Sequence, residues 1–201
     1  MKTVKDGNLY KAVKQVERTY WKYDDFVQPV LTANGAMGGD SFACDQSNSF
    51  SSTTLAWRCF NGDSTTESET NRWQINNIKT SSWYWLAWYN PIPLNITSLS
   101  IYNSQATYVV KAYKIQASDD NTNWVDIVTG TNTNTGELNK WVIDMSNNQA
   151  YYKYYRIYCR PNSTTSLQVA EIEITANYIA AGTAEDYDFY TDENVYKGVN
   201  L

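Results

Sequence analysis

Apolar and polar residues alternate along the segment 108–127, which carries the clearest structural pattern in the chain. The apolar positions recur on one side at a period of two, and they are Tyr113, Ile115 and Ala117. Such alternation is typical of a β-strand with one buried and one solvated face. The polar run 118–121 can bond to its own backbone, so it predicts a tight turn before a second strand containing Trp124 and Ile127.

A second alternating segment, 83–89, is rich in aromatic residues. One face carries Trp83, Trp85, Ala87 and Tyr89, and the other carries Tyr84, Leu86 and Trp88. In a two-layer sandwich one of these sets faces the core, and the pattern does not say which. The segment 151–159 also has aromatic residues on both faces. Rings in excess of what one core buries are suited to stacking on the apolar face of a sugar.

The two ends of the chain differ from its centre. Residues 1–25 hold six basic and four acidic residues, whereas residues 179–201 hold one basic and five acidic residues. Near the start, Asp6-Gly7 predicts a turn, and residues 9–23 fit an extended arm, with a helix as the alternative. We therefore divide the chain into an N-terminal arm (1–25), a central domain (26–178) and an acidic tail (179–201). The opposite charges predict that arm and tail pair within one chain or between neighbours.

Composition narrows the class of protein. Of the 201 residues, 15% are aromatic and 18% are charged, which is typical of a packed β-rich domain. A net charge of −5 provides no basic footprint for nucleic acid. No apolar run approaches the ~20 residues of a membrane span, and the opening residues lack the apolar run of a signal peptide, so we expect neither membrane insertion nor secretion.

The chain contains no histidine. Imidazole metal sites and histidine-dependent catalytic triads are therefore excluded. Its three cysteines, Cys44, Cys59 and Cys159, are an odd number and lack the spacing of a metal site. We expect them to be reduced and buried, with a Cys44–Cys59 disulfide as the alternative in an oxidising compartment.

The segment 108–127 resembles the F-x-V-x-x-S-x-D-G-x-x-W hairpin of the discoidin family, also called the coagulation factor V/VIII type C or galactose-binding-like domain. Further segments are similar to motifs of that family, in the order it requires: LAWRCFNGD at 55–63 followed by Trp73, WLAWYNPIPLNI at 85–96, YYRI at 154–157 and EIEI at 171–174. The resemblance covers residues 28 to 178. It implies an all-β fold, a galactose-binding-like jelly-roll β-sandwich.

The resemblance also implies a structural calcium ion. In that family the turn at the end of the motif matched here by residues 55–63 often binds calcium, together with the glutamate of the closing strand. Calcium takes hard oxygen ligands, and the matching positions here are Asn61, Asp63, Thr66 and Glu171. Asn61 stands where an aspartate is usual, which removes one negative charge, so a plain hydrogen-bonded turn is the alternative.

A ligand site is expected in the loops at one end of the sandwich. Arginine and asparagine in the loop 160–166 suit sugar hydroxyls, although a solvated loop explains the same residues. The candidate ligand-binding residues are Trp83, Tyr84, Arg72, Tyr108, Arg160 and Asn162. Arg156 matches the arginine of the Y-x-R-I motif, which is structural in the family, and is left out of the site.

These observations favour a non-catalytic carbohydrate-binding module. The opening residues 1–20 are similar to the starts of small virion or tail-associated bacteriophage proteins with discoidin-like domains. That resemblance implies a tail, fibre or capsid-decoration protein, located on the phage particle, that contacts host-surface or mucosal glycans. The alternative is a purely structural virion subunit that assembles with other subunits, or with copies of itself, through the jelly roll and its terminal arms.

An enzyme is the third and least favoured interpretation. Paired carboxylates are the usual acids of glycosidases, and the candidates are Asp119 with Asp120 and Glu171 with Glu173. The first pair lies in a predicted turn, and the discoidin family assigns the second pair no catalytic role.

Overall fold

The computed structural model divides the chain into two compact units, residues 1–23 with 180–201, and residues 24–179. It describes residues 2–5, 8–11, 20–65, 70–133 and 139–182, with side chains at 25–65, 70–133 and 139–178.

The first unit contains a β-hairpin. β1 (Lys2–Lys5) pairs antiparallel with β2 (Asn8–Lys11), and Lys5 lies opposite Asn8. β3 (Tyr20–Asp25) is extended as well. The described parts of the predicted arm are therefore strands and not a helix. The predicted turn at 6–7, residues 12–19 of the arm and residues 183–201 of the acidic tail lie outside the described residues.

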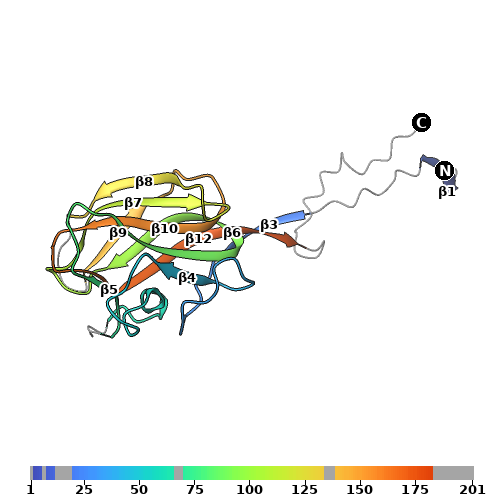
Figure 1. The fold of residues 1–201 in the computed structure, drawn as a ribbon. Helices are drawn as coiled ribbons and strands as arrows, with labels where there is room; N and C mark the ends of the chain where they lie inside the picture. Colours follow the sequence, from blue (N-terminus) through green and yellow to red (C-terminus); the bar gives the residue numbers. More distant parts are fainter. Residues whose placement is uncertain (1, 6–7, 12–19, 66–69, 134–138, 183–201) are drawn as a thin grey trace. The chain divides into compact units, whose positions relative to one another are not determined.

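The second unit is a β-sandwich built from antiparallel strands, as the sequence predicts (Figure 1). One layer contains β4 (Ala43–Gln46), the first part of β6 (Tyr84–Tyr102), β10 (Tyr152–Pro161), β7 (Val110–Ser118) and β8 (Val125–Thr131). The other contains β12 (Glu171–Gly182), the second part of β6 and β9 (Lys140–Asp144), with β3 next to β12. A short 3-10 helix, η1 (Ala56–Phe60), and the pair β5 (Trp73–Asn76) and β11 (Ser166–Val169) complete the unit.

Strand β6 passes from one layer to the other. Its residues 84–89 pair with β4 and β10, and its residues 95–102 pair with β12 and β9. Between them stand Pro91 and Pro93, which have no backbone N–H to donate to a ladder. The register with β10 shifts at this point, and the Asn90 side chain donates to the Ile92 carbonyl at 2.7 Å. The bend lets one continuous strand contribute to both layers.

The core settles which face of the segment 83–89 is buried. Leu86 and Trp88 belong to the core cluster and the partly buried Tyr84 packs against it. On the other face Trp83 and Trp85 are partly covered, and Ala87 and Tyr89 are buried outside that cluster. The Trp88 indole lies 5.9 Å from the Phe60 ring and is stacked on Tyr155, with centroids 6.1 Å apart. The three cysteines are buried and unpaired, as predicted, and burial raises the pKa of each thiol.

The β7–β8 hairpin confirms the turn predicted at 118–121. Asp120 accepts hydrogen bonds from the backbone N–H groups of Thr122 and Asn123, at 2.9 and 2.7 Å. These bonds hold the pKa of its carboxyl well below the usual range. Asn121 adopts a φ of 59°, a left-handed conformation that asparagine tolerates. Ile115 and Ala117 face the core, as their spacing predicts.

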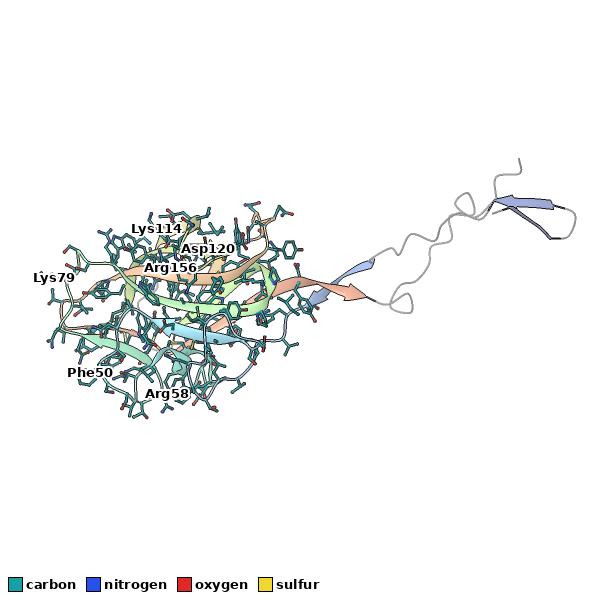
Figure 2. All side chains as sticks on the ribbon, turned by 45° about the vertical axis from the view of Figure 1, so that its right-hand side comes forward. Phe50, Arg58, Lys79, Lys114, Asp120 and Arg156 are labelled. Atoms are coloured by element: carbon teal, nitrogen blue, oxygen red, sulfur yellow. The ribbon has the colours of Figure 1, made fainter. Side chains whose placement is uncertain are left out.

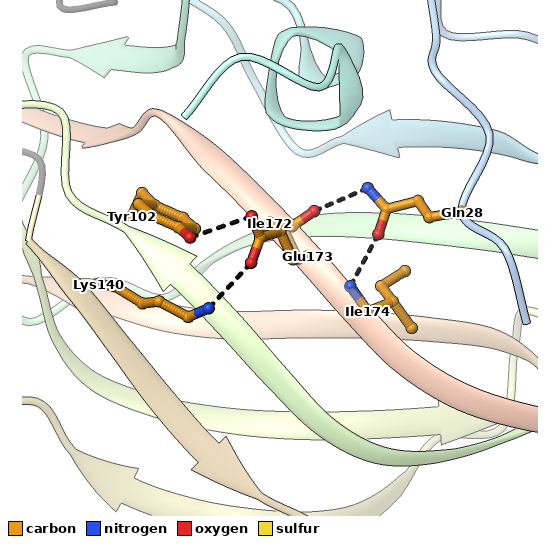
Figure 3. A network of polar contacts seen from close by, with 6 residues as sticks. All are labelled: Gln28, Tyr102, Lys140, Ile172, Glu173 and Ile174. Atoms are coloured by element: carbon orange, nitrogen blue, oxygen red, sulfur yellow. Dashed lines mark hydrogen bonds and ion pairs between the residues drawn. The ribbon is translucent and has the colours of Figure 1, made fainter. Parts of the chain in front are cut away.

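A glutamine side chain extends the sheet at the edge of β12. The Gln28 amide donates to the Ile172 carbonyl at 2.9 Å and accepts from the Ile174 N–H at 2.7 Å, as a neighbouring strand would (Figure 3). On the same strand, Glu173 accepts from the Tyr102 hydroxyl at 3.0 Å and pairs with Lys140 at 3.1 Å. One side chain thereby satisfies two backbone groups of β12, the Ile172 carbonyl and the Ile174 N–H.

Gln28→Ala is expected to lower the free energy of unfolding by about 1–2 kcal/mol, because two hydrogen bonds to β12 are lost. Urea denaturation of the full chain measures the change. Gln149→Ala is the matched control, since Gln149 is exposed and makes one long bond, 3.4 Å to the Ser146 carbonyl. Equal effects of the two substitutions would show that the Gln28 amide adds nothing at the edge.

Within the part of the chain that the structure describes, no helix has the length and apolar character to span a membrane.

Candidate functional site

Three loops meet at the edge of the sandwich where β10 ends. β6 and β10 are antiparallel, so Tyr84 at the start of β6 lies beside Cys159 near the end of β10. The loop before β6 is tied to the loop after β10 by a bond from the Asn77 N–H to the Thr165 carbonyl, at 2.9 Å. The Asn162 N–H donates to the Val109 carbonyl, at 3.2 Å, which adds the segment before β7. We call this edge the loop rim, and define it by residues 77–83, 105–111 and 160–165.

The loop rim contains a hollow of about 440 Å³. Its walls are formed by Thr80, Lys111, Ala112, Arg160, Pro161 and Asn162. The Arg160 guanidinium lies over the Trp83 ring, 4.9 Å from its centroid. The Nε of Arg160 is buried and has no hydrogen-bond partner. Lys111 and Asn162 are exposed, so amide, ammonium and guanidinium donors are all present at one opening.

Of the predicted ligand residues, Arg160 and Asn162 line this hollow, and Trp83 lies next to it, in contact with the Arg160 guanidinium. Tyr84 supports the rim from beneath, because its ring packs on the core and its hydroxyl accepts from the Lys79 N–H at 3.2 Å. Tyr108 is partly buried, and its carbonyl accepts from the Gln168 N–H at 2.8 Å. Neither tyrosine lines the hollow.

Arg72 lies inside the protein. It is 3% exposed and donates to Gln74 at 2.8 Å and to Ser104 at 3.2 Å. These bonds satisfy a buried cation, which would otherwise be costly, so the side chain is part of the packing beneath β5. It is not placed where a ligand in the hollow would meet it.

Sequence reasoning missed Lys111 and Thr80. Lys111 reaches the hollow because the register of β7 on β10 places Ala112 opposite Arg160. That register joins residues almost fifty positions apart, and no local pattern records it. Thr80 reaches the hollow because it lies in the turn just before Trp83. The sequence, rich in serine and threonine there, indicates only a loop.

The outer face of the layer that contains β10, β7 and β8 carries a series of cation–aromatic contacts, which ends at Arg160 in the hollow. Arg156 lies 4.1 Å above the Trp124 ring and 5.0 Å from that of Tyr158, and Tyr158 is stacked on Trp83 with centroids 4.9 Å apart. The Arg156 guanidinium also donates to Gln116 at 2.7 Å. Such contacts contribute about 0.5–2 kcal/mol each. They give Trp83, and through it Arg160, a defined position.

Next to this series, Lys114 forms an ion pair with Asp126 at 2.6 Å (Figure 2 labels Lys114 and Arg156). Asp126 also accepts from Gln116 at 2.6 Å. Hydrogen bonds from Lys114 and then from Gln116 lower the pKa of the Asp126 carboxyl. Both partners are substantially exposed, so the pair adds little stability, but it leaves Lys114 already neutralised.

The turn at 61–63 faces the start of β12. Gly62 has a φ of +77° and its N–H donates to Glu171 Oε1 at 3.3 Å. The Asp63 N–H donates to Asn61 Oδ1 at 3.0 Å, and Asn61 Nδ2 donates to Asn71 Oδ1. Asp63 Oδ1 accepts from the Thr65 hydroxyl at 3.1 Å. Thr66, the remaining predicted ligand, lies outside the described residues.

Glu171, at the start of β12, is a buried carboxyl group that faces this turn. It is 1% exposed, and its Oε2 has no hydrogen-bond partner. Burial, with smaller contributions from the carboxylates of Glu173 and Asp63, raises the pKa of Glu171 to about 8. Within the described ranges no cluster of three or more His, Cys, Asp or Glu side chains is arranged to hold a metal. A cation here would therefore depend on amide, hydroxyl and carbonyl oxygens besides Asp63 and Glu171.

The remaining carboxylate pair occupies a structural position. Asp119 and Asp120 are exposed in the β7–β8 turn, where Asp120 is bonded to the backbone of the turn itself. Glu173, the partner of Glu171, is held by Tyr102 and Lys140. These bonds account for Asp120 and Glu173 without a reaction.

Comparison with known proteins identifies the fold. No protein-family model matches the sequence, and no curated protein matches it. Solved structures do match. An F5/8 type C domain from Bacteroides fragilis has a TM-score of 0.55 at 17% identity, covering 68% of this chain and 91% of that one. Chitosan-binding module 1 of a chitosanase/glucanase from Paenibacillus sp. IK-5 has a TM-score of 0.52 at 22% identity, covering 68% and 96%.

The module CBM32-5 from Clostridium perfringens, solved in complex with GalNAc-β-1,3-galactose, has a TM-score of 0.53 at 13% identity, covering 67% of this chain and 94% of that one. At these identities the likeness shows the fold. The central unit thus has a β-sandwich fold similar to that of these domains, as the motifs in the sequence predict.

Proposed function

We propose that this chain is a non-catalytic carbohydrate-binding module that holds a glycan in the hollow of the loop rim. The observation that carries the proposal is the convergence of Arg160, Asn162 and Lys111 at one opening, where Arg160 also contacts the Trp83 indole. This combination suits a sugar, because the donors form hydrogen bonds to hydroxyl groups and an aromatic ring can cover the apolar C–H face.

The fold supports the same proposal. Its structural neighbours include modules described as binding chitosan or solved with a bound disaccharide. A shared scaffold does not transfer a ligand, so the hollow itself is the basis for the assignment. A second, larger hollow of about 570 Å³ lies between β8 and residues 144–150, but its lining residues include two aspartates and no cation.

Trp83→Ala and Asn162→Ala are each expected to weaken glycan binding about 10-fold or more, because one removes the ring beneath Arg160 and the other an amide donor. A glycan array identifies the ligand, and calorimetry on the full chain measures the affinity. Phe50→Ala is the control, since Phe50 is an exposed ring (58%) outside the loop rim. Binding that survives both rim substitutions would place the glycan elsewhere.

We also propose calcium at the turn 61–63. The buried Glu171 with an orphaned Oε2 fits a cation, because a positive charge would stabilise the ionised carboxylate that burial disfavours. Asn61, Asp63 and Glu171 would hold the ion together with carbonyl oxygens of the turn, and Thr66 is the further candidate. The ion would brace the turn against β12 and take no part in a reaction.

For the biological setting we propose a phage structural protein whose terminal arms bind other virion subunits or copies of itself. Two features of the chain support this proposal. Its two ends belong to a unit distinct from the sandwich, and the two ends carry opposite net charge. Weak sugar sites gain avidity when a particle displays many copies. Light scattering on the full chain and on residues 24–179 would show whether the ends drive assembly. A purely structural subunit would oligomerise through its ends and give no signal on the array.

A further inference from the structure

The cations of the hollow in the loop rim lack acidic partners. Arg160 and Lys111 both line the hollow, and no carboxylate is among its lining residues. Among the described residues neither side chain forms an ion pair, and the Nε of Arg160 is buried without any acceptor. By contrast Lys114, on the same strand as Lys111, is neutralised by Asp126.

The two cations oppose the net charge of the chain. The chain carries a net charge of −5, so at long range it repels anions. Two uncompensated cations at one opening therefore form a local exception, effective within the ~8 Å over which charges act at physiological salt. A third basic residue, Lys79, directly precedes Thr80 of the lining, and Figure 2 shows it at one end of the sandwich.

We propose that the hollow selects an acidic sugar, a unit that bears a carboxylate or a sulfate. This inference rests on the proposed function and adds the class of ligand. The hydroxyls of a neutral sugar accept hydrogen bonds from Arg160 and Lys111 but bring no negative charge, so part of the cost of desolvating the two cations remains. An anionic group offsets it, since a guanidinium fork pairs with two oxygens at once and an ammonium adds a point charge.

The other lining groups suit the rest of such a sugar. Thr80 and Asn162 offer a hydroxyl and an amide, which both donate to and accept from ring hydroxyls. The stack of Arg156, Tyr158 and Trp83 limits the movement of Arg160, so less entropy is lost when it binds an anion.

Calorimetry on the full chain with charge-matched probes tests the inference. Trigalacturonate is compared with its methyl ester, and galactose 6-sulfate with galactose, at low and high NaCl. We expect the charged member of at least one pair to bind 10-fold or more tightly than its neutral counterpart, with an advantage that shrinks as salt rises. The pair that shows the advantage identifies the carboxylate or the sulfate as the group recognised.

Variants assign the effect to the hollow. Arg160→Ala and Lys111→Ala are expected to remove most of the charged advantage, Arg160→Lys to restore part of it, and Lys114→Ala to leave it unchanged. Lys111 is exposed, so its variant keeps the test valid if Arg160→Ala folds poorly. Thermal melts check that each variant is folded.

The outcomes separate the two proposals. If neutral sugars bind as tightly as acidic ones, and Trp83→Ala and Asn162→Ala weaken both, the proposed function stands and the acidic-sugar inference is overturned. If no probe binds and the glycan array is empty, both fail. If Lys114→Ala lowers the charged advantage as much as Lys111→Ala does, the attraction is a general surface effect and the inference is again overturned.

Discussion

Raising the pH from about 5 to about 9 in the presence of a chelator is expected to lower the free energy of unfolding by roughly 4 kcal/mol, and Glu171→Gln is expected to abolish most of that loss. In the folded state burial raises the pKa of Glu171 to about 8, from an ordinary value of 4.5. The folded protein therefore holds the Glu171 proton more tightly than the unfolded chain does. The stabilisation is complete below the unfolded pKa and disappears as the pH rises through the folded pKa.

No histidine titrates in this pH window, and the three buried thiols, whose pKa burial raises, add to the loss of stability only near its upper end. Urea denaturation at several pH values measures the slope. A stability that is flat between these values, in a chelated sample, would mean that Glu171 is not held protonated by the fold. Glu173→Gln is the control, since Glu173 lies two residues away on the same strand, is half-exposed and is paired with Lys140. It should leave most of the loss in place, because Glu173 contributes less than burial to the raised pKa of Glu171.

Calcium is expected to reverse the loss at high pH. The ion binds the ionised carboxylate, so its effect on the melting temperature should be largest near pH 9 and small near pH 5. Glu171→Gln and Asp63→Asn should both reduce the shift. A melting temperature that calcium leaves unchanged at every pH would remove the ion from the proposal and leave a hydrogen-bonded turn with a neutral glutamic acid.

Trp88→Ala is expected to cost about 3–5 kcal/mol of unfolding free energy, which is the usual range for deleting a large ring from a closed core. Trp88 is fully buried between Phe60 and Tyr155 at the junction of β6, β10 and η1. Urea denaturation or thermal melts measure the loss. Trp85→Ala on the opposite face of the same strand is the control, with an expected cost of about 1 kcal/mol, because Trp85 lies outside the core cluster.

Trp88→Phe sharpens this test. The indole N–H of Trp88 is buried and finds no acceptor among the described residues. An unsatisfied buried donor costs about 1–3 kcal/mol, so phenylalanine loses packing but removes that penalty, and the net change should be within about 1 kcal/mol. A loss from Trp88→Phe as large as that from Trp88→Ala would show that the N–H is satisfied, for example by an internal water.

Features encoded by neighbouring residues were predictable. The β7–β8 hairpin follows from a period of two and from Asp120, whose side chain bonds within three positions of itself. The β-sandwich follows from the order of the motifs at 55–63, 85–96, 154–157 and 171–174. Burial of the three cysteines was likewise expected from the type of residue and the absence of metal-site spacing.

The candidate site was predictable only in part. Trp83, Arg160 and Asn162 carry side chains suited to sugars, and the structure places Arg160 and Asn162 in one hollow with Trp83 against Arg160. Arg72 has an equally suitable side chain but lies inside, since its neighbours Gln74 and Ser104 satisfy it there. Residue type alone does not distinguish an arginine in a site from one in the interior.

The amino-acid sequence by itself determined the all-β class, the hairpin and the exclusion of histidine chemistry, because these depend on composition and on contacts within a few positions. Only the tertiary structure decided that Leu86 and Trp88 face inwards, that Lys111 joins Arg160 at one hollow, and that Gln28 completes the edge of β12. Each of these depends on the register between strands far apart in the chain. A shift of one residue in that register would turn every side chain to the opposite face.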